Sequence, residues 1–322
     1  MFLVPNFKGI NLFPPDARIP FMRFKGVCLA ASFIAMALSI VLMVTVGFNY
    51  GVDFKGGSMI EVQSKSGPVD LASVRSKLAS LGLGEVQIQE FGAPNDILIR
   101  VEEQPGGEEA QPQAVNKVLA ALGDDFVQRR VEIVGPAVSS ELRTTGIIAV
   151  LVSLIGISAY VWFRFEWQFA IGAVLSLAHD VLLVAGVFSL LQWDFDLSTV
   201  AALLTILGYS VNDTVVVSDR IRENLRKFKK MELDELLNLS INETLSRTIL
   251  TGLTTILVLV VLVLIGGEVI RYFSLAMLLG VIIGTYSSMF IAAPLLGYTG
   301  IKRDWSGAGA KGKKSPAVPS GA

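Results

Sequence analysis

Residues 197–217 read LSTVAALLTILGYSVNDTVVV, an apolar stretch in which Asp213 is the only charged residue. A helix needs about 20 mostly apolar residues to cross the hydrocarbon core of a bilayer. The stretch therefore predicts a membrane span with an aspartate inside it. A charge at the bilayer centre costs about 2.5–3.5 kcal/mol on insertion scales, so this residue needs a partner, water or a function.

The full chain also has the composition of a membrane protein. Charged residues make up 17% of it and hydrophobic residues 52%, whereas soluble domains carry about 25% charged residues. Five further stretches are long and apolar enough to span a bilayer: 27–48, 144–163, 168–191, 245–265 and 272–297. The first has no cleavage site after it and is expected to stay as an anchor. The sequence thus predicts a polytopic α-helical membrane protein with six transmembrane helices.

The Lys and Arg residues that flank these spans predict the orientation. Sixteen of them fall on the side of the N-terminus, and only Arg271 falls in a short loop on the other side. Because positive charge is retained on the cytoplasmic side, we expect both termini to be cytoplasmic. The expected segments are a cytoplasmic N-terminal segment (1–26), transmembrane helix 1 (27–48), an extracytoplasmic domain (49–143), transmembrane helices 2–6 (144–303) with a cytoplasmic loop (218–243), and a disordered cytoplasmic tail (304–322).

The extracytoplasmic segment differs in charge and pattern from the spans. It holds 9 Lys and Arg residues against 14 Asp and Glu residues, a balance of −5. Alternating polar and apolar residues predict strands at 58–64, 85–91, 96–102 and 126–134, and helical patterns fall at 68–81 and 112–122. The order β-α-β-β-α-β is that of a ferredoxin-like α+β domain, which we expect between helices 1 and 2.

Four ionisable residues lie inside the spans: His179, Asp180, Asp213 and Arg247. At 1.5 Å of rise per residue, Asp213 and Arg247 fall at similar depth near the cytoplasmic face, so an ion pair between them is feasible. The polar residues that could support such a site are Ser210, Asn212, Thr251 and Thr255. Two interpretations stay open: the cluster locks helices together as a static network, or an intramembrane carboxylate is reversibly protonated.

Several classes of site are excluded. One cysteine, Cys28, rules out an intrachain disulfide and a Cys-based metal site. One histidine rules out a multi-His zinc site, and no basic cluster interleaved with aromatic residues suggests nucleic-acid binding. No phosphate loop stands in a strand–helix context. We therefore expect no metal, no cofactor and no ATP-driven enzyme, and any work must come from an ion gradient or a partner.

Five stretches together resemble the SecF family, whose members pair with SecD as accessory subunits of bacterial preprotein translocase. They are Gly51-Val-Asp-Phe-Lys-Gly-Gly57, Ala178-His-Asp180, the long stretch from Gly208 to Asn224 (GYSVNDTVVVSDRIREN), Thr244-Leu-Ser-Arg-Thr248 and Gly266-Gly267. The resemblance covers about residues 20–303. One departure is Lys55, which stands where that family commonly has Thr or another small residue.

The resemblance implies a proton-driven component of the resistance-nodulation-division superfamily in the bacterial inner membrane, with its large domain in the periplasm. Together with SecD it would use the proton gradient to assist preprotein export, with protons as the coupling ion. The implied partners are SecD, the SecYEG translocon and the translocating preprotein, with YajC as a further candidate. Asp213 would be the intramembrane carboxylate and Arg247 its basic partner. Asp53, Gly56 and Gly57 would belong to the motif after helix 1.

Three other functions stay as alternatives. Half of a proton-driven exporter of lipids or small molecules would share the scaffold but predicts a larger outer domain. An intramembrane aspartyl protease using Asp180 and Asp213 would need a Gly-x-Gly-Asp context that neither residue has. A static membrane scaffold would hold the buried charges fixed.

Overall fold

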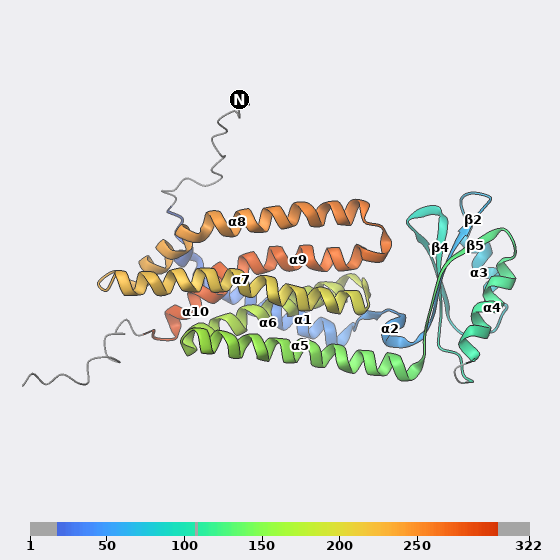
Figure 1. The fold of residues 1–322 in the computed structure, drawn as a ribbon, viewed down its shortest axis with the longest axis horizontal. Helices are drawn as coiled ribbons and strands as arrows, with labels where there is room; N and C mark the ends of the chain where they lie inside the picture. The colour runs from blue at the N-terminus through green and yellow to red at the C-terminus, as the bar shows by residue number, and fades with distance from the viewer. Residues whose placement is uncertain (1–17, 107–108, 302–322) are drawn as a thin grey trace, which may run out of the picture.

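The computed structural model describes residues 18–106 and 109–301. The expected tail, 304–322, and most of the N-terminal segment lie outside the described residues. Among the described residues, six helices are long and apolar enough to cross a membrane, and they lie together in one bundle with an α+β domain at one end (Figure 1). The helices of the bundle are α1 (Lys25–Thr45) after the short turn η1 (Phe21–Phe24), α5 (Pro136–Arg164), α6 (Trp167–Leu191), α7 (Leu197–Lys227), α8 (Leu233–Ile265), and α9 (Arg271–Ser287) with its continuation α10 (Ala293–Tyr298). The short turn η2 (Glu268–Ile270) precedes α9. The chain is a multi-pass membrane protein.

Three helices run further than the apolar stretches that predicted them. Helix α7 continues to Lys227 and α8 begins at Leu233, so most of the expected loop 218–243 is helical. Helix α5 begins at Pro136, inside the segment assigned to the outer domain. Hydropathy marks only the part of a helix that faces lipid, whereas these extensions are amphipathic and continue on buried residues such as Ile221 and Ile241.

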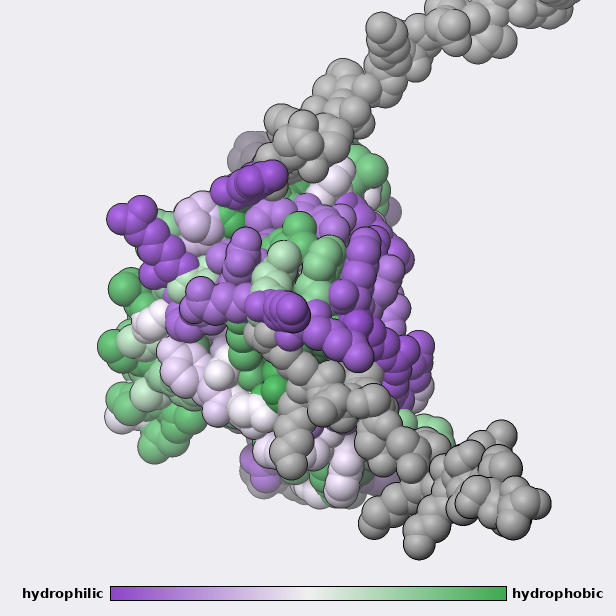
Figure 2. All heavy atoms as spheres, turned by 90° about the vertical axis from the view of Figure 1, so that its left-hand side faces the viewer, coloured by the Kyte–Doolittle hydropathy of each residue, from purple (hydrophilic) through white to green (hydrophobic). Residues whose placement is uncertain are grey.

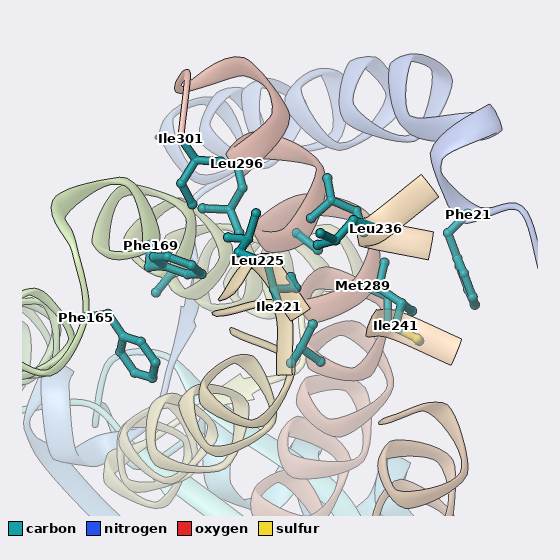
Figure 3. Close-up of a cluster of buried hydrophobic side chains, with 14 of the residues drawn as sticks. Phe21, Phe165, Phe169, Ile221, Leu225, Leu236, Ile241, Met289, Leu296 and Ile301 are labelled. Atoms are coloured by element: carbon teal, nitrogen blue, oxygen red, sulfur yellow. The ribbon is translucent and has the colours of Figure 1, made fainter. Parts of the chain in front are cut away.

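The extensions of α7 and α8 form a core at the end of the bundle opposite the α+β domain. Ile221 and Leu225 from α7 pack with Leu236 and Ile241 from α8, and both sets meet side chains of α6 and the last helix (Figure 3). Phe21 from the start of the described chain and Ile301 from its end join the same cluster. Both described ends therefore lie at this end of the bundle, where hydrophilic side chains gather on the surface (Figure 2).

The α+β domain holds four strands and two helices in the expected order. They are β2 (Gly57–Ser64), α3 (Leu71–Ala79), β3 (Val86–Phe91), β4 (Ala93–Val101), α4 (Ala110–Leu122) and β5 (Phe126–Val134). The sheet order is β3-β4-β2-β5, antiparallel throughout, which fits the ferredoxin-like arrangement. Helices α3 and α4 cover the face turned away from the bundle (Figure 1), burying Ile60, Ile97 and Ile99 completely.

A small second sheet joins the domain to the bundle. Strand β1 (Asn49–Tyr50), which follows α1, pairs in parallel with β6 (Asp194–Phe195), which links α6 to α7. One turn of helix, α2 (Val52–Lys55), leads from β1 to the domain. The rings of Phe48 and Phe195 pack 4.5 Å apart beside it. No sequence pattern predicted this pairing, because two-residue strands are too short to show alternation.

Candidate functional site

Asp213 lies in the middle of α7 and is held by hydroxyl groups from two other helices. Thr248 of α8 donates to Oδ1 at 2.6 Å, and Ser288 donates to Oδ2 at 2.5 Å. Ser288 begins η3 (Ser288–Ala292), a π-helical turn between α9 and α10. Such turns often occur at functional sites because they redirect side chains within a helix. Three helices thus converge on one intramembrane carboxylate.

Asp180 of α6 forms a second, deeper cluster. Its side chain is fully buried, and Ser210 of α7 and Ser287 of α9 donate to Oδ2 at 2.5 and 2.8 Å. Nδ1 of His179, also buried, lies 2.9 Å from Oδ1. Ser176 donates to the hydroxyl of Ser287 at 2.9 Å. The predicted supporting residues His179, Asp180 and Ser210 therefore meet in one network.

Arg247 does not contact Asp213. The two residues lie within electrostatic range, but among the described residues no ion pair within 4.0 Å joins them. Arg247 and Thr251 are exposed on the outer face of α8, where the Thr251 hydroxyl donates to the Arg247 carbonyl at 3.0 Å. Thr255 continues the stripe, half-buried, and donates to the Thr251 carbonyl. Asn212 of α7 is also exposed, so these four residues lie outside the network.

The network sits where α7 and α9 approach closely. A Cβ on Gly280 would lie 2.3 Å from Ile206, and one on Gly284 would lie 3.2 Å from Ser210. The glycine pair therefore lets the backbone of α9 reach the serine and aspartate of its neighbours.

The sequence interpretation missed Thr248, Ser287 and Ser288. Two adjacent serines inside the last span were the available signal.

The residues of the motif after helix 1 lie at the joint between the domain and the bundle. Asp53 Oδ2 accepts from the backbone N–H of Leu197 at 2.9 Å, which satisfies a free donor at the N-terminus of α7. Gly57 has φ +113°, and a Cβ there would lie 2.4 Å from the Val101 carbonyl. Gly56, at φ +78°, gives the chain its turn out of α2. The motif therefore fixes the sheet relative to the helix that carries Asp213.

An ion pair strengthens this joint. Arg100 of β4 forms a bidentate salt bridge with Asp194 of β6, in which Nη1 lies 2.9 Å from Oδ1. Burial alone would lower the pKa of Arg100, but the hydrogen bond and charge of Asp194 raise it above its ordinary value. Asn49 of β1 also donates to Asp194, at 2.8 Å. The pair lines a cleft of about 420 Å³ between the open face of the sheet and the ends of the helices.

The arrangement of the two intramembrane carboxylates differs from that of an aspartyl protease. An aspartyl protease needs two carboxylates that share a proton, whereas Asp180 and Asp213 are bound by separate hydroxyls. Among the described residues no group of three or more His, Cys, Asp or Glu side chains could hold a metal ion. Hydroxyl groups both donate and accept hydrogen bonds, so they suit a carboxylate in either protonation state.

The chain matches two family models. The family model described as "Protein export membrane protein SecD/SecF, C-terminal" matches residues 114–302, and "SecD/SecF GG Motif" matches residues 41–67. The first match contains Asp180, Asp213 and Arg247, and the second contains Asp53, Gly56 and Gly57.

Curated relatives and a solved structure agree. The chain is 46% identical to protein translocase subunit SecF of Rickettsia felis over 291 residues, covering 89% of this chain and 94% of that protein. It is 44% identical to SecF of Rhodobacter capsulatus, covering 95% of each. SecDF of Brucella abortus is 45% identical over 92% of this chain. The crystal structure of SecDF from Thermus thermophilus matches with TM-score 0.79 and 38% identity over 89% of this chain. The chain spans 39% of the length of each SecDF protein. It therefore belongs to the SecD/SecF family of protein-export membrane proteins, as a SecF-type translocase subunit.

Proposed function

We propose that this chain uses the proton gradient, together with SecD, to assist preprotein export across the bacterial inner membrane. Reversible protonation of Asp213 would be coupled to movement of the α+β domain. The observation that carries the proposal is an intramembrane carboxylate bound by hydroxyls from two neighbouring helices. Ionisable residues within spans commonly mark ion pathways, and the relatives are named as protein translocase subunits.

The hydroxyl partners make Asp213 switchable. A guanidinium in contact would hold the carboxylate ionised, but Arg247 stands apart from it on the outer face of α8. When Asp213 takes up a proton, Thr248 and Ser288 can still bond to it, because a hydroxyl also accepts. Both states keep their hydrogen bonds, so the proton can exchange without a large loss of stability.

SecD is the partner that the outer face of α8 would meet. An arginine exposed within the membrane costs about 2.5–3.5 kcal/mol. Arg247, in the stripe with Thr251 and Thr255 on the outer face of α8, is such an arginine. A second helical bundle packed on α8 would remove this cost. The SecDF relatives, of which this chain spans 39%, carry additional sequence that could supply such a bundle. Approach of a partner helix would also change the electrostatic interaction between Arg247 and Asp213.

The charge distribution supports the proposed orientation, and the resemblance to SecF supports the proposed partners. Both termini would lie in the cytoplasm and the α+β domain in the periplasm, where it would meet the preprotein leaving the SecYEG translocon, with YajC as a further partner. Protons are the proposed coupling ion and no bound cofactor is required. Each proton that crosses the full potential supplies about 2.3 kcal/mol per 100 mV, enough to bias a domain movement of a few kcal/mol.

Preprotein export into inverted membrane vesicles, with the proton gradient present or collapsed, tests the proposal. Asp213→Asn keeps the shape of the side chain but cannot ionise, and it should insert normally while losing gradient-dependent stimulation. Arg247→Met should lose it as well, and Thr251→Ala should cost less. Asn212→Ala, next to Asp213 but exposed, is the matched control and should keep full stimulation. Full stimulation in Asp213→Asn at normal protein levels would make the site a static network.

A further inference from the structure

The proposed function leaves the most deeply buried acid–base pair of the bundle unused. The side chains of His179 and Asp180 are 1% and 0% exposed, and Nδ1 of the imidazole contacts the carboxylate. On the opposite side of the ring, Nε2 is buried and has no hydrogen-bond partner among the described residues. One nitrogen of a membrane-buried histidine is therefore free to take a proton.

The charge of the pair changes sharply when Nε2 binds that proton. With Asp180 ionised and the hydrogen of a neutral imidazole on Nδ1, the pair carries one negative charge. A proton on Nε2 turns it into an imidazolium–carboxylate pair with no net charge, and no other bond is made or broken. Because an uncompensated charge is costly in an apolar interior, the environment favours uptake of one proton by the pair.

Two adjacent serines connect this pair to Asp213. Ser287, the last residue of α9, donates to Asp180, and Ser288, the first residue of the π-helical turn η3, donates to Asp213. Each hydroxyl also has a backbone carbonyl within reach: Gly284 for Ser287 and Thr285 for Ser288, both at 3.1 Å. A hydroxyl has one hydrogen, so each serine can bond its carboxylate or turn back to its helix. The two carboxylates thus share one pair of adjacent serines with alternative hydrogen bonds.

Helix α7 supplies a second connection. Ser210, which donates to Asp180, lies three residues before Asp213 on the same helix, so the two side chains are neighbours on its surface. One further titratable group, Tyr286, faces the histidine from another helix. The ring of Tyr286 on α9 lies 6.1 Å from that of His179, and its hydroxyl donates to the carbonyl of Cys28 on α1.

We propose that Nε2 of His179, supported by Asp180, is a second proton-binding site whose occupancy is coupled to that of Asp213 through Ser287 and Ser288. The proposal rests on Asp213 being the first site. An ionised Asp213 favours a proton on His179, and protonation of Asp213 removes that attraction. The two sites therefore take up protons in opposition, so that proton uptake at one weakens uptake at the other.

Nuclear magnetic resonance of the single histidine tests this directly. His179 is the only histidine in the sequence, so ¹⁵N-histidine labelling of the full chain in lipid nanodiscs gives signals from this ring alone. We expect a transition from imidazole to imidazolium within the pH range in which the protein stays folded. In Asp180→Asn its midpoint should fall by about 1–3 pH units, and in Asp213→Asn by a smaller amount. Replacing Ser287 and Ser288 with alanine should reduce the effect of Asp213→Asn.

The proposal is overturned if His179 does not titrate in this range, or if its midpoint is the same in Asp180→Asn and in the unaltered protein. Ser189→Ala removes a buried serine of α6 that bonds the Gly47 carbonyl instead, and it should leave the midpoint unchanged. Because this measurement needs no export, a His179 that titrates while Asp213→Asn retains export would refute the proposed function alone.

Export gives the functional readout. In His179→Asn the side-chain amide can still donate to Asp180, but it has no nitrogen that binds a proton at these pH values. Gradient-dependent stimulation in this variant should lose its dependence on pH over the range in which His179 titrates. A structural role would lower stimulation equally at every pH, and that outcome would contradict the proposal.

Discussion

Breaking the ion pair between Arg100 and Asp194 should release the α+β domain from the bundle. The two side chains are only 15% and 10% exposed, and removing one partner of a buried pair costs about 3–5 kcal/mol. Asp194 keeps its hydrogen bond from Asn49 at 2.8 Å, so Arg100→Met should fall at the low end, near 3 kcal/mol. At 1.4 kcal/mol per tenfold change, the ratio of docked to undocked domain should drop by about 100-fold.

The assay is the distance between two spin labels in the full chain in nanodiscs. Cys28, the single cysteine, is first replaced with serine, and labels are attached through cysteines at the exposed positions Glu90 on β3 and Leu190 on α6. The parent protein should give one narrow distance distribution. Arg100→Met should give a second, broad population of distances. The double variant Arg100→Met with Asp194→Asn should lose less free energy of docking than the sum of the two single changes.

A matched arginine provides the control. Arg130 pairs with Glu132 on the same sheet, but those side chains are 43% and 30% exposed, and surface pairs contribute about 0–1 kcal/mol. Arg130→Met should therefore leave the distribution narrow. An unchanged distribution in Arg100→Met, or equal broadening in both variants, would refute the assignment of the joint to this pair.

Three further outcomes follow from the structure. Gly57→Ala places a Cβ 2.4 Å from the Val101 carbonyl at φ +113° and should lower the free energy of unfolding of the domain by more than about 2 kcal/mol. The control Gly82→Ala, where φ is positive but the space is open, should lower it by about 1 kcal/mol. Equal melting temperatures for the two variants would contradict the argument. Gly280→Ala places a Cβ 2.3 Å from Ile206 and should destabilise the contact of α7 with α9 by about 1–3 kcal/mol. The measurement is the melting temperature in detergent, which should fall. The control Gly208→Ala, in open space, should leave it unchanged. A cysteine replacing Gly106 should react with a membrane-impermeant reagent added to intact cells, and one replacing Lys229 should not; the reverse labelling would invert the proposed topology.

The six spans were predictable because the bilayer imposes a length and a composition on each one separately. Boundaries beyond the lipid were not, because Ile221 and Ile241 are buried by each other's helices rather than by the membrane. The strand and helix order of the α+β domain was likewise readable, since alternation and helical periodicity are local properties. The pairing of β1 with β6 joins residues 145 positions apart and leaves no local trace.

The candidate site was predictable in part for the same reason. An aspartate in an apolar stretch is visible in the sequence, but its hydrogen-bond partners come from distant positions. Thr248 is 35 residues from Asp213, and Ser288 is 75 residues from it. Depth along a span can be counted from sequence, whereas the direction of a side chain around the helix axis cannot. Successive residues turn by about 100°, so Thr248 faces Asp213 and Arg247, one residue earlier, points away.

Helix α7 runs without interruption from the joint to the far end of the bundle, and this gives it the properties of a lever. Asp213 lies 16 residues from Leu197, where Asp53 accepts from the backbone at 2.9 Å. At 1.5 Å per residue this arm is about 24 Å long. A tilt of about 5° at the carboxylate would move the end of such an arm by about 2 Å, more than a hydrogen bond can stretch before it breaks. Under the proposed coupling, such a tilt would either carry the α+β domain along with the end of α7 or break the Asp53 contact.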